Sequence, residues 1–346
     1  MSPREHVMAV LRGEAVDRVP FTVYESMIPQ CSVERRLRNQ GLCIVQRRVP
    51  CVITETPNCP EEVHYYREDG RQMIRVVIHT PAGDLTQLKE PAGITTWTKE
   101  HIFKEPEDYR RLEALVKDGR SRPNYEAYAK AERAAGDDVI VRAGIGGVPL
   151  HDIMIHWMGA EIFSVEWAER RDEILRLEKI MREKVIEVCR LVADGPITHA
   201  NLGGNMIPEF MGPPRFREFC VPLFRECADI FHRKGKWIGS HMDGNNKPWA
   251  DDLAHSGLDY IEAFTPAPDT DMSVADALAA WPKQVLWINF PSSLHVAGID
   301  RIKQATREIL EAAAGTNRLI IGITEDMPED RWQGNLLAIS EVINGG

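Results

Sequence analysis

The sequence predicts an α/β protein folded as a (β/α)8 TIM barrel with an antiparallel β insertion early in the chain. Two patterns support this prediction. From Lys104 onward, short apolar segments of strand length alternate with longer segments of helical periodicity, which is typical of a parallel sheet with helical crossovers. Strands are expected near residues 21, 50, 138, 197, 236, 260, 284 and 318, and eight is the strand number of such a barrel. A doubly wound open sheet is the alternative.

The chain length is compatible with one domain. Its 346 residues exceed the usual size of a single domain, but α/β barrels of this length fold as one. No linker or change of composition divides the sequence, and 43% of its residues are hydrophobic, which is enough for a sizeable core. We therefore expect a single barrel domain over residues 1–346, with the β insertion at about residues 43–100.

The first elements are predicted from local signals. Ser2-Pro3-Arg4-Glu5 has the form of a capping box with proline at the first helical position, so a helix is expected from there to about Leu11. Pro20 precedes a first strand, Phe21-Thr22-Val23-Tyr24. Within the insertion, Glu68-Asp69-Gly70-Arg71 and Thr80-Pro81-Ala82-Gly83-Asp84 are turn sequences. They predict an antiparallel meander with strands at 63–66, 73–79 and 84–88.

The remaining elements follow the alternation of helices and strands. Helices are expected at 106–117, 125–135, 172–192, 214–234, 248–255, 273–280, 300–313 and 328–343, and strands at 138–142, 197–200, 236–240, 260–263, 284–288 and 318–322. Pro222 lies inside the helix expected at 214–234. Because proline lacks the N–H that an unbroken helix requires, we expect a kink there.

Charge and cysteine content narrow the function. The net charge is −10 and the sequence has no long run of Lys or Arg, which argues against nucleic acid or an acidic membrane surface as a partner. No apolar stretch reaches the roughly 20 residues that span a bilayer, and the amino terminus carries no apolar signal segment. Seven cysteines without a CxxC pair favour reduced thiols, and therefore a cytoplasmic location.

Polar residues at the ends of the expected strands form the candidate active site, because the loops after the strands build the site of a barrel. His241 follows the strand at 236–240, and Asp243 is two residues later, so both side chains leave the backbone on the same side. Glu325 follows the last strand. Together these three residues form a candidate catalytic and metal-ligand set that leaves one coordination position of zinc open. A proton-sharing triad without metal, or a histidine bonded to a capping aspartate, is the alternative.

Other strand ends carry the candidate substrate-binding residues Tyr24, Glu25, Asn201, Glu262 and Asn289. Glu262 and Asn289 are alternatively expected to orient the metal ligands by hydrogen bonds, and helix capping explains Asn289 equally well. His151 and His156 lie on an expected helix, but they are five residues apart rather than four, which argues against a shared metal. His151 remains a candidate for the lining of the site.

Several short motifs occur in a specific order along the chain. They are R-x-x-V-x-x-V-L-x-G-E with D-R-V-P from Arg4 to Pro20, Thr80-Pro81-Ala82-Gly83-Asp84-Leu85, Phe103-Lys104-x-Pro106-Glu107-Asp108, Phe216-Arg217-Glu218-Phe219-x-x-Pro222, Gly235-Lys236 ahead of His241, and Ser256-Gly257-Leu258-Asp259. In these motifs the chain resembles the uroporphyrinogen decarboxylase superfamily, and in particular its cobalamin-dependent methyltransferase branch. The resemblance covers nearly the whole length and implies a (β/α)8 barrel.

Two departures distinguish the chain within that superfamily. The decarboxylases carry an arginine-rich amino-terminal segment that holds the porphyrin carboxylates, whereas this chain has Val23-Tyr24-Glu25-Ser26-Met27-Ile28, where Glu25 would repel a polycarboxylate. The thiol-methylating members bind zinc through H-x-C and a distant Cys, and the matching positions here are His241, Asp243 and Glu325. Carboxylate ligands are harder than thiolates and favour oxygen at the open position.

The resemblance therefore implies the methyltransferase component of an O-demethylase-like system. It would move a methyl group from a small donor, a methoxylated aromatic or another methyl ether, to cobalt(I) of the cobalamin on a partner corrinoid protein, since this chain has no D-x-H-x-x-G signature of its own. A cofactor-free decarboxylase that uses Asp243 or Glu325 as acid and base is the alternative, and a binding module without turnover is the non-enzymatic one. The sequence leaves open whether the chain forms a homodimer.

Overall fold

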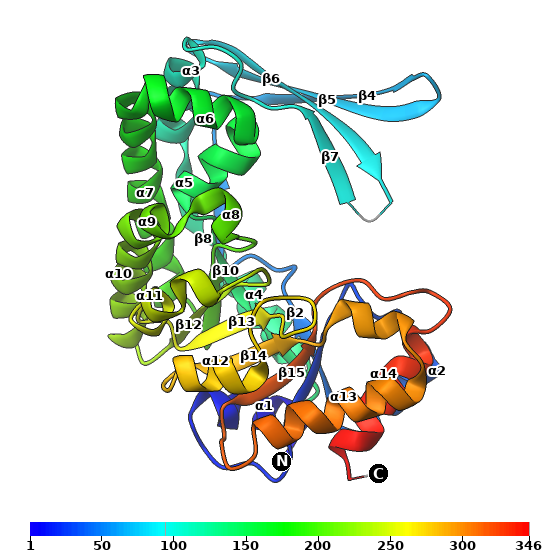
Figure 1. The fold of residues 1–346 in the computed structure, drawn as a ribbon. Coiled ribbons are helices and arrows are strands. Elements are labelled where there is room, and N and C mark those ends of the chain that lie inside the picture. The colour runs from blue at the N-terminus through cyan, green and yellow to red at the C-terminus, as the bar shows by residue number, and fades with distance from the viewer. Residues whose placement is uncertain (94, 346) are drawn as a thin grey trace. The chain divides into compact units, whose positions relative to one another are not determined.

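The computed structural model describes residues 1–93 and 95–345. The chain divides into two compact units (Figure 1). The first, which we call the barrel unit, contains residues 1–51, 124–146 and 192–345. The second, which we call the insertion unit, contains residues 52–123 and 147–191. Each unit has its own sheet structure and is described separately.

The barrel unit is a parallel sheet that nearly closes on itself. Its strands are β1 (Phe21–Tyr24), β2 (Leu42–Gln46), β9 (Val139–Val141), β10 (Ala143–Gly146), β11 (His199–Leu202), β12 (Trp237–His241), β13 (Tyr260–Phe264), β14 (Val285–Asn289) and β15 (Leu319–Ile323). They pair in the order β10-β11-β12-β13-β14-β15-β1-β2-β9, and every neighbouring pair is parallel. Only Arg142 separates β9 from β10 in the chain, so these two strands count as one of the eight expected strands. The predicted (β/α)8 barrel is confirmed.

The second barrel strand lies earlier in the chain than the sequence pattern indicates. β2 covers Leu42–Gln46 and pairs with β1 in the register Phe21↔Leu42, whereas the pattern places this strand near residue 50. The apolar segment that follows contributes β3 (Val52–Glu55), which pairs with an antiparallel partner in the insertion unit. Two apolar segments are close together here, and only the pairing with β1 decides which of them joins the barrel.

The helices of the barrel unit mostly begin and end near the predicted residues. They are α1 (Pro3–Leu11), α2 (Ser32–Asn39), α4 (Tyr125–Ala134), α8 (Pro208–Met211), α9 (Pro213–Arg215), α10 (Val221–His232), α11 (Ala250–Ala254), α12 (Val274–Ala280), α13 (Ile299–Ala312) and α14 (Trp332–Ile343), with short 3-10 turns η3 (Lys247–Trp249) and η4 (Ser292–Val296). The Ser2 hydroxyl accepts from the Glu5 amide at 3.3 Å, and the Glu5 carboxylate accepts from the Ser2 amide at 2.8 Å, which confirms the capping box. Ahead of α10, Phe216–Cys220 form the π-turn η2, because Pro222 cannot donate the amide that an α-helix needs.

The core of the barrel unit joins the first helix to strands from several sides of the barrel. Its buried members are Val7, Val10, Leu11, Tyr24, Cys43, Val45, Ile140, Tyr260, Val285, Trp287 and Ile320. Trp287 is fully buried, and its indole N–H donates to the Thr22 hydroxyl at 2.9 Å. Burial of this apolar surface is the main force that holds the strands, and with them the strand ends, in place.

The insertion unit is dominated by an antiparallel meander. Its elements are β3, β4 (Glu61–Glu68), β5 (Arg71–Thr80), β6 (Gly83–Ala92), β7 (Thr95–Glu100), α3 (Asp108–Asp118), β8 (Arg120–Pro123), α5 (Pro149–His151), the π-turn η1 (Asp152–Met158), α6 (Gly159–Glu169) and most of α7 (Arg171–Asp194). Strands β4 to β7 pair in chain order, so the predicted antiparallel insertion is confirmed and β7 is an additional strand. The tight turn between β4 and β5 uses positive φ at Asp69 and Gly70, +50° and +78°. In the described part of the chain, every helix is too short or too polar to cross a lipid bilayer.

Candidate active site

Two strand ends of the barrel unit bring His241, Asp243 and Glu325 together. His241 is the last residue of β12, Asp243 follows it closely, and Glu325 follows β15. One ligand atom of each residue lies within 4.8 Å of those of the other two, and His241 Nε2 is 3.5 Å from Asp243 Oδ2. Since β13 and β14 separate β12 from β15 in the sheet, the cluster depends on the curvature of the barrel.

The imidazole of His241 is held by Glu262 on the neighbouring strand. The two residues are register partners of β12 and β13, and His241 Nδ1 lies 3.1 Å from Glu262 Oε2. The contact with Glu262 occupies Nδ1. The other ring nitrogen, Nε2, faces Asp243 and is therefore the one available to a metal. Burial lowers the pKa of His241, but the charge of Glu262 and the hydrogen bonds with Asp243 and Glu262 outweigh burial and raise this pKa to about 9.

The donor set of the cluster fits a divalent metal ion such as zinc. One imidazole nitrogen and two carboxylate oxygens are ligands that zinc accepts, and a carboxylate behind the histidine, here Glu262, is the usual support for such a ligand. The two carboxylates also favour a cation between them. Burial raises the pKa of Glu325, and the nearby charge of Asp243 raises it further. Metal binding itself stays a prediction.

Glu262 is the centre of a buried network that the sequence patterns identify only in part. Its side chain is fully buried, and Arg142 Nη1 lies 2.6 Å from its Oε1. Asn201 donates to Oε2 at 2.8 Å, and the Tyr24 hydroxyl donates to Oε1. The Arg142 contact is an ion pair by distance but lacks hydrogen-bond angles, so direct charge attraction dominates it. Burial raises the pKa of Glu262, but the charges of Arg142 and His241 outweigh burial and lower it.

The backbone beside Glu262 is irregular. The pairing of β13 with β14 shifts register between Glu262 and Phe264. Between them, Ala263 has φ of +56°, a left-handed conformation that is uncommon for residues other than glycine. β-Bulges of this kind are frequent next to active sites, where they redirect a side chain. The conformation costs about 1–3 kcal/mol and persists only because surrounding contacts determine it.

Asn289 supports the loop that carries Glu325. Its side chain is buried at the end of β14. Its Oδ1 accepts from the Thr324 amide at 3.0 Å, and its Nδ2 lies 3.4 Å from the Thr265 hydroxyl, to which it donates. Thr324 directly precedes Glu325 in the chain. Asn289 therefore positions a candidate metal ligand rather than capping a helix.

Two members of the network around Glu262, Arg142 and Tyr260, are not among the residues predicted from sequence. Arg142 donates to the Tyr24 hydroxyl at 3.3 Å, and the Tyr260 hydroxyl donates to Asn201 Oδ1 at 2.6 Å. Arg142 had a signal, because it directly follows the apolar strand Val139–Val141, and a charged residue at the end of a barrel strand is a functional candidate. No sequence pattern distinguishes Tyr260 from a tyrosine that only packs.

Glu25 is not an uncompensated negative charge, which corrects the argument that it would repel a polycarboxylate. Arg47 Nε and Arg48 Nε each lie 3.4 Å from one of its carboxylate oxygens. The Arg47 guanidinium also lies over the Tyr24 ring, 3.4 Å from its centroid, in a cation–π contact. A cavity of about 610 Å³ borders this edge, lined by Glu25, Ser26, Met27, Ile28, Pro29, Arg48, Asp326, Met327, Glu329 and Trp332.

The comparison with known families decides the assignment. The profile of the uroporphyrinogen decarboxylase (URO-D) family matches residues 74–344. The chain belongs to the URO-D family. Among solved structures, this URO-D protein is similar to a methyltransferase from Methanosarcina mazei, at 16% identity and a TM-score of 0.64, over 99% of this chain and 98% of that chain. Its similarity to the pneumococcal virulence factor StrH, at 9% identity over 98% of this chain and 84% of that one, has a TM-score of only 0.39. No curated protein matches the chain.

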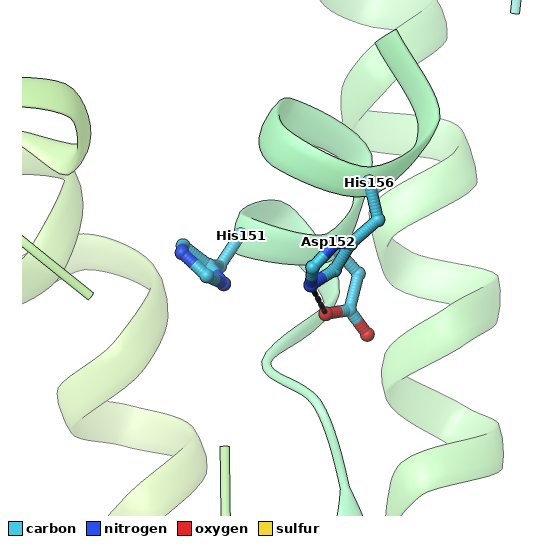
Figure 2. A group of neighbouring side chains, drawn as sticks. All are labelled: His151, Asp152 and His156. Carbon is cyan, nitrogen blue, oxygen red and sulfur yellow. Dashed lines mark ion pairs between the residues drawn. The ribbon is translucent and has the colours of Figure 1, made fainter. Parts of the chain in front are cut away.

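The URO-D barrel of this chain connects most of the predicted site residues. Direct contacts join His241 to Asp243, and join Glu262 to His241, Tyr24 and Asn201. Glu25 borders the cavity, and Asn289 holds the loop of Glu325. His151 belongs to the insertion unit, where it lies beside Asp152 and His156 (Figure 2).

Proposed function

We propose that this URO-D family protein is a methyltransferase that passes a methyl group from a methyl ether, such as a methoxylated aromatic, to cobalt(I) of the cobalamin on a partner corrinoid protein. The observation that carries the proposal is the cluster of His241, Asp243 and Glu325, in which Nε2 of His241 faces Asp243 while Nδ1 contacts Glu262. The motifs of the methyltransferase branch and the fold shared with the Methanosarcina methyltransferase agree with it.

In the proposed site, His241, Asp243 and Glu325 hold zinc. When bound, zinc supplies Lewis-acid activation of the donor oxygen. Glu262 orients the imidazole of His241, and Asn289 holds the loop that carries Glu325. This preorganisation matters because a misplacement of about 1 Å in an active site can cost roughly 100-fold in rate.

The cavity of about 610 Å³ is the proposed donor pocket. It is bordered by Glu25, which follows β1, and by Asp326, which follows Glu325 in the chain. The rest of its lining is largely polar, but Ile28, Met327 and Trp332 supply an apolar part that suits an aromatic ring. In the proposed reaction the carbon–oxygen bond of the methyl ether breaks and its electron pair stays on the donor oxygen, which takes a proton from solvent. The electron pair of cobalt(I) forms the new bond to the methyl carbon, so the methyl group leaves on the corrinoid of the partner protein.

The test is methyl transfer to a corrinoid protein reduced to cobalt(I), or to free cob(I)alamin, from a panel of methoxylated aromatics and methylated amines. We expect methylcobalamin, followed by its absorbance, with the wild type, and a rate lower by about 100-fold or more with His241→Ala. His255→Ala is the control, because His255 is an exposed histidine outside the cluster. Carbon dioxide release from a carboxylate substrate, with no methyl transfer from any donor, would overturn the proposal.

A decarboxylase is the second candidate, because Arg47 and Arg48 lie at the edge of the same site and are suited to a carboxylate. In that reaction Asp243 or Glu325 would supply and remove the proton. The requirement for metal distinguishes the two candidates. Treatment with a chelator is expected to abolish methyl transfer and zinc is expected to restore it, whereas a cofactor-free decarboxylase would be insensitive to both.

A further inference from the structure

A second group of metal-ligating side chains lies in the insertion unit. One ligand atom each of His151, Asp152 and His156 lies within 4.8 Å of those of the other two. His151 is the last residue of α5, and Asp152 and His156 belong to the π-turn η1. Figure 2 shows the three side chains on one helical segment, with an ion-pair contact between Asp152 and His156.

The π-turn explains why residues five apart meet. In a π-helix the backbone hydrogen bonds run between residues i and i+5, so these two residues share a face. The rings of His151 and His156 accordingly lie with centroids 5.9 Å apart and planes at 88°. The expectation from sequence that these two histidines do not share a metal rests on α-helical spacing, whereas the structure has a π-turn here. π-Turns inside helices are also frequent at functional sites.

The carboxylate of Asp152 is partly withdrawn from water, and in the described part of the chain it has no close partner. Among the described residues its ion-pair contact is His156 Nε2 at 3.9 Å, which is too long for a hydrogen bond. Only 26% of the Asp152 side chain is exposed. A Cβ at Gly147 would overlap the Asp152 carboxylate, so glycine is needed there to make room for it. Partial burial of a charged group without a hydrogen bond is costly, and a bound cation would offset that cost.

We propose that His151, Asp152 and His156 bind a divalent transition-metal ion of the zinc class, with water at the remaining position. Two imidazoles and one carboxylate are a donor set that zinc accepts with an open position. The His156 side chain is 65% exposed and lines a cavity of about 410 Å³ together with Lys89 and Trp157, so an ion can enter from solvent. The site shares no residue with the cluster of His241, Asp243 and Glu325, and it does not depend on the proposed methyl transfer.

Zinc content per chain tests the proposal. The full-length protein is stripped with a chelator, reloaded with zinc, desalted and analysed by elemental analysis. We expect about two zinc ions per chain for the wild type, about one for His156→Ala, about one for His241→Ala and none for the double variant. The deciding quantity is the difference between the wild type and His156→Ala. That difference is about one ion even if the barrel site binds none, so the two proposals fail separately.

Two further variants make the result specific. His255 is also exposed and lies 3.6 Å from Asp251, four residues earlier, but among the described residues no third ligand joins the pair. His255→Ala should therefore keep the zinc content of the wild type. Asp152→Asn keeps the size of the side chain and should weaken zinc binding by about 10–100-fold in a titration. In a His241→Ala background cobalt(II) gives a spectroscopic signal for this site alone, and adding His156→Ala should remove that signal. Equal metal content in the wild type and His156→Ala would overturn the proposal.

Discussion

The two candidate metal clusters of this protein are built in opposite ways. We call them the barrel cluster (His241, Asp243 and Glu325) and the π-turn cluster (His151, Asp152 and His156). The barrel cluster comes from strands that are separated by two others in the sheet, so it exists only when the barrel has formed. The π-turn cluster comes from six consecutive residues and depends on the local path of one helical segment.

The two clusters are connected to the stability of the protein in different ways. In the barrel cluster, His241 contacts Glu262, which is fully buried and forms an ion pair with Arg142. The residue that holds this candidate ligand in place is therefore also part of the core. The π-turn cluster ends on His156, whose side chain is mostly exposed. Changes around the barrel cluster should therefore alter metal affinity and folding together, whereas changes in the π-turn cluster should alter metal affinity alone.

The largest effect on folding is expected from Glu262→Gln. The amide keeps the shape of the side chain but leaves the buried Arg142 without its counterion, at a cost of about 3–5 kcal/mol in the free energy of unfolding. Urea denaturation measures this loss. Glu209→Gln is the control, because Glu209 is an exposed carboxylate that accepts from Asn245, and its loss should stay near 1 kcal/mol or less. Equal losses in the two variants would show that Glu262 does not connect the cluster to the core.

Acidification tests the role of burial in the barrel unit. Burial lowers the pKa of His295 to about 4 and that of His199 to about 3, from an ordinary value of 6.5. Below pH 6.5 these histidines bind protons in the unfolded chain but stay neutral in the native state. The free energy of unfolding is therefore at its full value above pH 6.5 and decreases as the pH falls toward 4. For His295 alone the loss reaches about 3 kcal/mol.

The measurement is the free energy of unfolding in urea at several pH values between roughly pH 7.5 and pH 4.5, where the His295 effect is expected. His295→Gln should flatten the dependence on pH, because the amide does not titrate. His255→Gln removes an exposed histidine and should leave the dependence as it is in the wild type. The same slope in His295→Gln and the wild type would contradict the prediction.

A smaller effect is expected from Asn289→Ala. The substitution frees the Thr324 amide and the loop of Glu325, which should lower the free energy of unfolding by about 1–2 kcal/mol. It should also weaken zinc binding at the barrel cluster by about 10–100-fold. Zinc titration in a His156→Ala background isolates this cluster. Asn317→Ala, which removes an exposed amide ahead of β15, is the control. Unchanged zinc affinity in Asn289→Ala would mean that the loop is held by other contacts.

The smallest effect on folding is expected from Glu25→Gln. Its two arginine contacts are 3.4 Å long, and the Arg47 and Arg48 side chains are 32% and 68% exposed, so solvent screening should keep the contribution of the pairs below about 1 kcal/mol. Turnover should nevertheless fall, because Arg47 and Arg48 lose their counterion at the edge of the donor pocket. Glu308→Gln is the control, because Glu308 is an exposed, ion-paired glutamate outside this cavity, and the variant should keep the turnover of the wild type. Full activity of Glu25→Gln would show that Glu25 only borders the site.

Local sequence signals determined much of the barrel and part of the site. The capping box at Ser2 and Glu5 marked the start of α1, and short apolar segments marked β12 and β15. His241 and Glu325 were recognisable as site residues because the active site of a barrel is built at the ends of its strands, where both residues lie. Such signals are readable from sequence because periodicity and capping involve neighbours within a few residues.

The remaining features were decided by tertiary structure. Pairing with β1 decides that residues 42–46 form the second strand. The barrel also places Arg142 beside the buried Glu262, so that Arg142 is the counterion of this carboxylate. The π-turn brought His151 and His156 together at a spacing that an α-helix would separate. In each case the outcome depends on contacts between segments far apart in the chain, or on a change of helix type. A pattern of hydrophobic and polar residues predicts neither long-range contacts nor a change of helix type. It shows which side chains face the core, but not which partners they contact there.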